Sequence, residues 1–264
     1  MPKRKLKLSN DIVLYTAAEG VATVTLNRPD QRNAINPEVC DQIRHAFDQV
    51  EADPDIRAAI LTGAGALFCA GMDLKAFAAG AGDQILFGQY GFGGFVKRQR
   101  TKPVVAAVEG AALAGGFEMM LACDLVVAGQ SAQFALPEVR IGLIPGAGGA
   151  VRLPVSVPRV RANEILLTGK PFGADDAASW GVINRVVPDG TALTAAQDMA
   201  RDIASNAPLA VRHTLAIANA AHIANDAAHW SENDRIITEI GKTADAAEGA
   251  RAFIEKRAPV WQGK

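Results

Sequence analysis

The chain has 264 residues, of which 49% are hydrophobic and 21% are charged. This balance is that of an ordinary globular protein and excludes a disordered chain. The 27 Lys and Arg residues nearly cancel the 28 Asp and Glu residues, so the net charge of −1 indicates neither a nucleic-acid partner nor an acidic membrane. No apolar run is long enough to span a bilayer. Three widely spaced cysteines without a Cys-x-x-Cys pair favour a reducing, cytoplasmic location over a disulfide framework or a zinc site.

The first predicted elements are two strands with a helix between them. Residues 21–26 alternate with a period of two and end at the turn sequence of residues 27–30, which predicts a strand. Residues 36–38 are a capping asparagine, a proline and a glutamate, which together predict the start of a helix. Its buried face is predicted at helical spacing by Val39, Ile43, Phe47 and Val50. Residues 58–61 predict a short buried strand.

A unit of strand, small-residue turn and helix then recurs. Residues 59–62 run into small residues and a helix predicted from Asp73. Residues 104–108 run, through Ala114-Gly115-Gly116, into a second helix. Residues 125–149 resemble a third, degraded copy. This repetition predicts an α/β core that is wound from similar units.

The character of the sequence changes near residue 191. We predict an α/β core over residues 1–190 and a helical region over residues 191–264, where Ala-rich stretches show helical spacing. Because this region is apolar on more than one face, it either packs on a neighbouring subunit or covers its own core. Residues 80–100 are rich in glycine and phenylalanine, and they form either a mobile wall over a pocket or an ordinary surface excursion.

Glu118 is the most unusual residue of the chain. Every other residue from 111 to 122 is apolar or glycine, so the helix that carries Glu118 is expected to be buried. Burial raises the pKa of a carboxyl group, and a raised pKa in a cleft suits general acid–base catalysis. The alternative is a structural carboxylate that pairs with a buried arginine or accepts from a backbone amide.

Two glycine turns predict a place for an anionic oxygen. Gly115 and Gly116 open the helix of Glu118, where backbone N–H groups point outward and a ligand can approach closely. Ala70-Gly71-Met72 repeats the arrangement in the preceding unit. If the two turns face each other, they supply two N–H donors to one oxygen, which is an oxyanion hole.

Glu138 follows Pro137 and precedes a run of glycines, in a region of tight turns. A second carboxylate near Glu118 would push the two pKa values apart, leaving one group as the acid and the other as the base. On the residues alone, an acid in a surface loop is the more frequent explanation. The sequence has no Gly-x-Ser-x-Gly elbow, no complete dinucleotide fingerprint and no Walker loop.

Several segments together carry the pattern of one known family. They are residues 24–29, 33–36, 68–75, 102–124, 134–152, 167–171, 180–187 and 248–256. On these segments the chain resembles the enoyl-CoA hydratase/isomerase, or crotonase, superfamily along its whole length. The resemblance implies an α/β fold, a crotonase-like ββα spiral core with a C-terminal helical trimerisation region, assembled as a homotrimer or a dimer of trimers. It also implies an acyl-CoA thioester as ligand, with no metal and no cofactor beyond the coenzyme A of the substrate.

The resemblance also implies a role for each matching residue. The amides of Met72 and Gly115 would hold the thioester oxygen. Residues that would meet coenzyme A are Ala70, Leu74, Lys75 and, from the tail of a neighbouring subunit, Phe253 and Lys256. Glu118 and Glu138 fall on the two catalytic glutamates of the hydratases. Glu118 would direct water to the β-carbon of a trans-2-enoyl-CoA, and Glu138 would protonate its α-carbon, giving the 3-hydroxyacyl-CoA.

Three alternatives stay open beside the hydratase. They are a dehydratase of carnitinyl-CoA type, a Δ3,Δ2-enoyl-CoA isomerase, which typically keeps one of the two acids, and a non-catalytic acyl-CoA-binding protein. Ala114 stands where many relatives carry a third glycine and Phe117 where a smaller residue is common, which predicts a reshaped pocket. Gly146 occupies the place where dienoyl-CoA isomerases have an acid, which argues against that activity.

Overall fold

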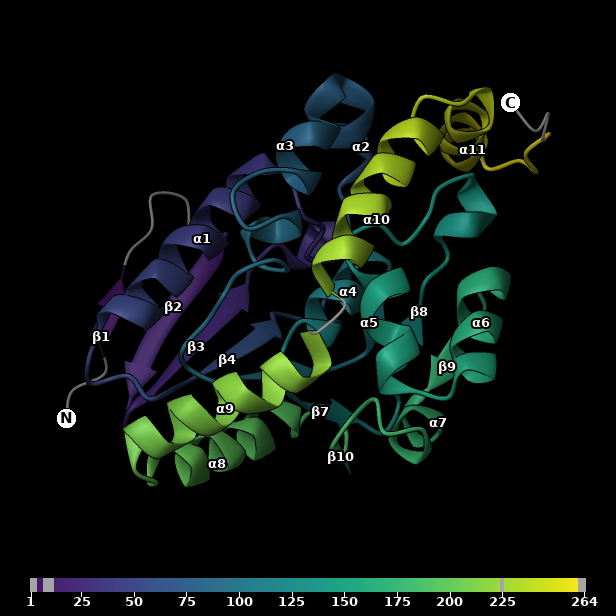
Figure 1. Cartoon of the computed structure of the whole chain (residues 1–264). Helices are drawn as coiled ribbons and strands as arrows, with labels where there is room; N and C mark the ends of the chain where they lie inside the picture. Colours follow the sequence, from purple (N-terminus) through teal and green to yellow (C-terminus); the bar gives the residue numbers. More distant parts are fainter. Residues whose placement is uncertain (1–3, 7–11, 224–225, 261–264) are drawn as a thin grey trace.

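The computed structural model describes residues 4–6, 12–223 and 226–260 (Figure 1). Its main sheet has seven strands in the order β1-β2-β3-β4-β5-β7-β10, of which the first two pairings are antiparallel and the others parallel. The strands are β1 (Arg4–Leu6), β2 (Val13–Ala18), β3 (Val21–Leu26), β4 (Ala58–Gly63), β5 (Val104–Val108), β7 (Leu125–Gly129) and β10 (Arg185–Val187). The two early strands predicted from the sequence are confirmed.

A second, three-stranded sheet gives the chain its spiral course. Its order is β6-β8-β9, and its strands are β6 (Ala111–Leu113), β8 (Gln133–Ala135) and β9 (Phe172–Gly173). An isolated bridge between Cys69 and Ala112 continues it on the side of the earlier unit. The units of β5 and β6 and of β7 and β8 therefore each place one strand in each sheet, and the first unit has β4 and this bridge. A helical segment follows in each case, which confirms the recurring unit and its third copy.

The helical segments join and cover the two sheets. The α-helices are α1 (Pro37–Ala52), α2 (Leu74–Ala76), α3 (Gly82–Leu86), α4 (Gly115–Leu121), α5 (Gly149–Ser156), α6 (Arg159–Thr168), α7 (Ala174–Ser179), α8 (Ala192–Ala204), α9 (Pro208–Ile223), α10 (Asp226–Ile240) and α11 (Ala244–Glu255). Short segments of other helix types are η1 (Pro29–Gln31), η2 (Phe77–Ala81), η3 (Phe92–Gly94) and η4 (Glu138–Ile141). The predicted cap of α1 is present, since Asn36 accepts from the Val39 N–H at 2.9 Å. Among the helices described, none has the length and apolarity that a bilayer span needs.

The C-terminal helical region packs on its own chain. The buried face of α8 consists of Ala192, Ala196, Met199, Ala200 and Ala204, and it packs against the main sheet in one apolar cluster with Ile60 and Val105. Further along, α10 lies against α5, and α11 lies against η4 (Figure 1). Of the two interpretations of this region, covering its own core is therefore confirmed, while packing on a neighbour stays a prediction.

The glycine-rich segment 80–100 is anchored in the core. Phe92 and Phe95 are each 1% exposed, and the Phe95 ring lies 4.7 Å from that of Phe47 in α1. Leu86 and Phe92 also line the large cavity described below. Residues 91–96 are thus buried beside the cavity, whereas residues 87–89 are exposed, so each interpretation holds for part of the segment. The mobility of the wall stays a prediction.

Candidate active site

Both glutamates lie on the wall of one cavity of about 960 Å³. Glu118 is in the first turn of α4 and is 2% exposed, and the N–H of Gly149 donates to its Oε1 at 2.7 Å. Glu138 opens η4 and is 8% exposed, and its buried Oε2 has no hydrogen-bond partner among the described residues. The interpretation of Glu138 as a surface acid is wrong, because η4, which carries it, packs against α11 and α6.

Burial raises the pKa of both glutamates. It raises the pKa of Glu118 to about 7, against the opposing effects of the Gly149 and Ala147 N–H groups and the Arg152 cation. Burial, and next to it the negative charge of Glu118, raise the pKa of Glu138 well above its usual value. Ionisation of Glu118 thus makes Glu138 hold its proton more tightly, which suits the pair to act as one base and one acid on the same cavity.

The two glycine turns touch each other, which meets the condition set by the sequence analysis for two donors to one oxygen. Gly71 has a φ of +93°, and a Cβ on it would lie 3.0 Å from the Gly115 nitrogen. In the bridge between Ile35 and Met72, the Ile35 N–H donates to the Gly71 carbonyl at 2.8 Å and the Asp73 N–H donates to the Ile35 carbonyl at 2.9 Å. The Met72 N–H takes no part in this bridge. Across the described part of the chain, neither the Met72 nor the Gly115 N–H donates to another residue. Both residues line the cavity, so two unused donors lie close together on its wall.

The departures at positions 114 and 117 have different consequences. Ala114 lines the cavity and has φ 50° and ψ −128°, a conformation that suits glycine, so this turn is strained. Phe117 points away from the cavity into the core, with its ring 5.6 Å from that of Phe134 and 5.7 Å from that of Phe172. The expectation that Phe117 reshapes the pocket is wrong, since it fills the space between α4 and the second sheet.

Four of the five residues expected to meet coenzyme A line the cavity. They are Ala70, Leu74, Lys75 and Phe253, whereas Lys256 is not part of the lining. The turn before α2 is fixed by Asp73, which caps the helix and pairs with Arg28 at 3.1 Å. Phe253 lies on the cavity of its own chain and is 58% exposed. That Phe253 and Lys256 meet coenzyme A in a neighbouring subunit stays a prediction.

The sequence analysis missed lining residues that come from distant elements. They include Arg32, Ile144, Ile237 and Arg257. Arg257 is held by Glu248, whose Oε1 it meets at 2.5 Å, and with Arg251 it keeps the pKa of Glu248 well below its usual value. Glu248, like Glu118, stands among alanines and glycine in the sequence. This signal could have predicted the ion pair of Glu248 and Arg257.

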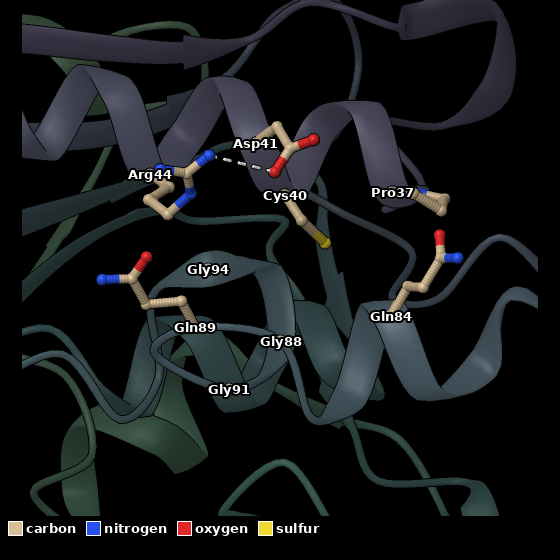
Figure 2. A pocket seen from close by; sticks show the side chains of 9 residues that line it. All are labelled: Pro37, Cys40, Asp41, Arg44, Gln84, Gly88, Gln89, Gly91 and Gly94. Carbon is tan, nitrogen blue, oxygen red and sulfur yellow. Dashed lines mark hydrogen bonds and ion pairs between the residues drawn. The ribbon is translucent and has the colours of Figure 1, made fainter.

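A second, smaller pocket of about 280 Å³ lies between α1 and the segment from α3 to η3 (Figure 2). Its acid, Asp41, is paired with Arg44 at 3.3 Å. Burial raises the pKa of the neighbouring Cys40 thiol to about 12, so this sulfur stays protonated and a poor nucleophile. Neither glutamate reaches this pocket, which therefore lacks an acid–base pair. The described residues also contain no group of three or more His, Cys, Asp or Glu side chains placed to hold a metal.

Comparison with known proteins agrees with this geometry. Residues 16–264 match the family model described as enoyl-CoA hydratase/isomerase. The enoyl-CoA hydratase EchA19 of Mycobacterium tuberculosis is 44% identical over 246 residues, covering 91% of this chain and 92% of the relative. A carnitinyl-CoA dehydratase of Salmonella typhi is 39% identical over 254 residues, covering 92% and 95% of the two chains. The crystal structure of a carnitinyl-CoA hydratase from Mycobacterium avium superposes with a TM-score of 0.91 at 43% identity, covering 97% and 100%.

The spiral of two sheets with its C-terminal helices is therefore the crotonase fold. The chain belongs to the enoyl-CoA hydratase/isomerase family. Family membership supports an enzyme of the lyase type that acts on acyl-CoA thioesters.

Proposed function

We propose that this protein is an enoyl-CoA hydratase, which adds water to a trans-2-enoyl-CoA and forms the 3-hydroxyacyl-CoA. The proposal depends on one observation: two buried glutamates with raised pKa values share a cavity wall with two unused backbone N–H donors. The reaction needs no metal and no redox cofactor, and coenzyme A enters as part of the substrate.

The N–H groups of Met72 and Gly115 bind the thioester oxygen in this proposal. Attack on the β-carbon moves electron density onto that oxygen, so the two donors stabilise the enolate more than the substrate. Each donor in such a site stabilises the transition state by roughly 3 kcal/mol. Ala70, Leu74 and Lys75 line the adjoining part of the cavity, where the coenzyme A portion lies.

Glu118 and Glu138 carry out the proton transfers. Ionised Glu118 takes a proton from water as the water oxygen bonds to the β-carbon. Protonated Glu138 donates to the α-carbon as the enolate collapses, so that H and OH are added in total. The direction of the shifts supports this assignment, because the negative charge of Glu118 raises the pKa of Glu138 and so favours its protonated form.

A dehydratase of carnitinyl-CoA type is the second candidate, because relatives with that name are similar over nearly the whole chain. Dehydration reverses the same chemistry at the same two acids. The part of the wall that comes from α3, η3 and α10 is apolar, with Leu86, Phe92 and Ile237. This lining favours an uncharged acyl chain over one that carries a quaternary ammonium group, since it offers that cation one aromatic face and no carboxylate.

The assembly is part of the proposal. Large apolar side chains are exposed in the C-terminal helical region, namely Leu209, Ile217, Phe253 and Ile254. Exposed apolar surface of this kind is typical of subunit interfaces. It supports the homotrimer or dimer of trimers that the family resemblance implies, in which Phe253 and Lys256 extend toward a neighbouring subunit.

Absorbance of the conjugated thioester tests the function directly. Wild type, Glu118→Gln and Glu138→Gln are assayed with short, medium and aromatic enoyl-CoAs and, in the dehydration direction, with carnitinyl-CoA. We expect turnover of an enoyl-CoA and a loss of roughly 10²–10⁴-fold in kcat for each variant, because each removes one proton transfer. Glu109→Gln is the matched control, since Glu109 also accepts a backbone N–H, from Ala192 at 2.8 Å, but lies outside the cavity.

Each pattern of results has one meaning. Loss of activity in both cavity variants, with coenzyme A binding retained, supports two-carboxylate hydration. Activity on carnitinyl-CoA alone selects the second candidate. Binding of thioesters without turnover of any of them would refute the enzyme and leave a binding protein.

A further inference from the structure

The C-terminal helix α10 packs against the active-site helix α5 (Figure 1), and Trp230 of α10 lies at this contact. The Arg152 guanidinium of α5 lies 5.1 Å from the centre of the Trp230 ring, and the Lys97 ammonium lies 4.5 Å from it. Lys97 is also paired, at 2.5 Å, with Asp234 one turn further along α10. Cations stack on the electron-rich face of an indole, so Trp230 ties α10 to both Arg152 and Lys97.

The same ring and guanidinium press on the start of α5. Gly148, the N-cap of α5, has a φ of +115°. A Cβ on Gly148 would lie 2.2 Å from Arg152 Nη1 and 2.8 Å from the Trp230 ring, so both groups pack directly on its backbone. Arg152 is anchored on its other side, because its Nη2 donates to the Val96 carbonyl at 2.5 Å. The position of Gly148 is therefore set by Trp230 of α10 and by Arg152, which the Val96 carbonyl anchors.

Gly148 is followed by the residue that binds the catalytic carboxylate. The Gly149 N–H donates to Glu118 Oε1 at 2.7 Å, so two residues of backbone separate the Trp230 contact from Glu118. A small rotation at Gly148 would turn this N–H away from the carboxylate. Catalytic geometry is sensitive on this scale, since a displacement of about 1 Å can lower a rate by about 100-fold.

We propose that Trp230 is a positioning residue for Glu118: its ring holds Arg152 and Gly148 so that the Gly149 N–H stays on the Glu118 carboxylate. This inference rests on the proposed function, in which Glu118 takes the proton from water. It assigns to the C-terminal region a part in the acid–base chemistry, although Trp230 itself does not line the cavity.

The charges around Glu118 fix the direction of the expected pH effect. Arg152 on α5 lowers the pKa of Glu118, whereas buried Glu138 on η4 interacts with it as a second acid. Cys123, after α4, has a pKa raised to about 12 and stays neutral, next to the ion pair of Arg100 and Asp124. Beyond Trp230, Lys97 and Asp234 neutralise each other. Loosening this contact therefore raises the pKa of Glu118, because it weakens first the Gly149 hydrogen bond and then the Arg152 cation, both of which lower that pKa.

The test compares Trp230→Leu and Trp230→Phe with a matched control, Trp180→Leu. Trp180 also carries a stacked arginine, Arg161 at 4.4 Å, and packs on Phe172 at 5.1 Å, but it lies outside the cavity lining. For Trp230→Leu we expect kcat to fall by about tenfold or more, KM to change by less than about threefold, and the acid limb of the kcat/KM profile to move up by at least about half a pH unit. Trp230→Phe, which keeps an aromatic face, restores most of both changes, and Trp180→Leu leaves the acid limb in place.

A double mutant and a substrate-free titration complete the test. Since Trp230 and Arg152 hold the same backbone at Gly148, adding Trp230→Leu to Arg152→Gln should move the acid limb by less than the sum of the two single shifts. Infrared titration of the buried carboxyl groups, with Glu118→Gln as the reference, measures the same pKa without turnover. An unmoved pKa in Trp230→Leu, an equal shift in Trp180→Leu, or additive shifts in the double mutant would overturn the positioning role. Full activity in Glu118→Gln would instead overturn the proposed function, whatever the titration shows.

Discussion

Replacing Glu118 with glutamine should make the protein more stable while it removes the activity. The folded protein holds this carboxyl group with a pKa of about 7, whereas its ordinary value is 4.5. The folded state therefore binds the proton more tightly than the unfolded chain does. The stabilisation that this gives is fully present below about pH 4.5 and is lost as the pH rises through 7.

The size of the effect follows from the two pKa values. Each pKa unit corresponds to about 1.4 kcal/mol, so ionised Glu118 lowers the unfolding free energy by about 3 kcal/mol above pH 7. Glutamine removes that charge, and its Oε1 can still accept from the Gly149 N–H. The amide group that replaces Oε2 leaves about 1 kcal/mol of unsatisfied hydrogen bonding. We therefore expect a net gain of about 2 kcal/mol at pH 8 and little or none at pH 5.

Urea unfolding at a fixed protein concentration, measured every half unit from pH 5 to pH 8.5, follows this difference. Glu109→Gln serves as the control, because Glu109 also accepts a backbone N–H, that of Ala192, but lies outside the cavity at a half-buried position. A Glu118→Gln variant that is less stable than wild type at pH 8, or equally displaced at every pH, would refute the argument from burial. In that case the carboxylate would be stabilised by its surroundings and not strained by them.

Two further predictions concern backbone contacts around the site. Ala114→Gly should raise the melting temperature by about 2–4 °C, because it removes strain of about 1–3 kcal/mol at φ 50°. Glycine also gives the unfolded chain more conformational entropy, which offsets about 1 kcal/mol of this gain. A lower melting temperature in calorimetry would contradict the strain. Gly249→Ala should lower the free energy of unfolding by about 1–3 kcal/mol, because its Cβ would lie 2.0 Å from the Ile141 carbonyl oxygen. It should also lower kcat, since the clash forces α11 away from η4, which carries Glu138. Ala247→Val, on the exposed side of α11, should leave both quantities unchanged, and equal effects of the two variants would sink this explanation.

The local parts of the fold and the site could be predicted because their signals are local. Glu118 was found from its apolar neighbours, and the two turns from glycines at matching places in a repeated unit. Glu118 also has the structural role given as the alternative, since its carboxylate accepts a hydrogen bond from the Gly149 N–H. Burial, hydrogen bonding and a raised pKa occur together at this residue, so its structural and proposed catalytic roles are compatible.

The distant parts of the site carried no comparable signal. Glu138 stands in a stretch of proline and glycine that suits a surface turn, and its burial comes from α11 packing on η4. Ile237 and Trp230 lie in one helix, α10, whose sequence does not specify which surface it covers. Position 117 was misjudged for the same reason, because the direction of a side chain on α4 depends on where the second sheet lies.

The close packing of α10 on α5 and of α11 on η4 also has a consequence for biosynthesis. On the ribosome, the last strand of the main sheet ends at Val187 and its covering helix at Ala204, whereas the cavity wall requires residues up to Pro259. Domains can fold while the chain is still being made. A nascent chain of about 204 residues thus contains the complete sheet but no finished catalytic groove, and activity arrives only with the final helices.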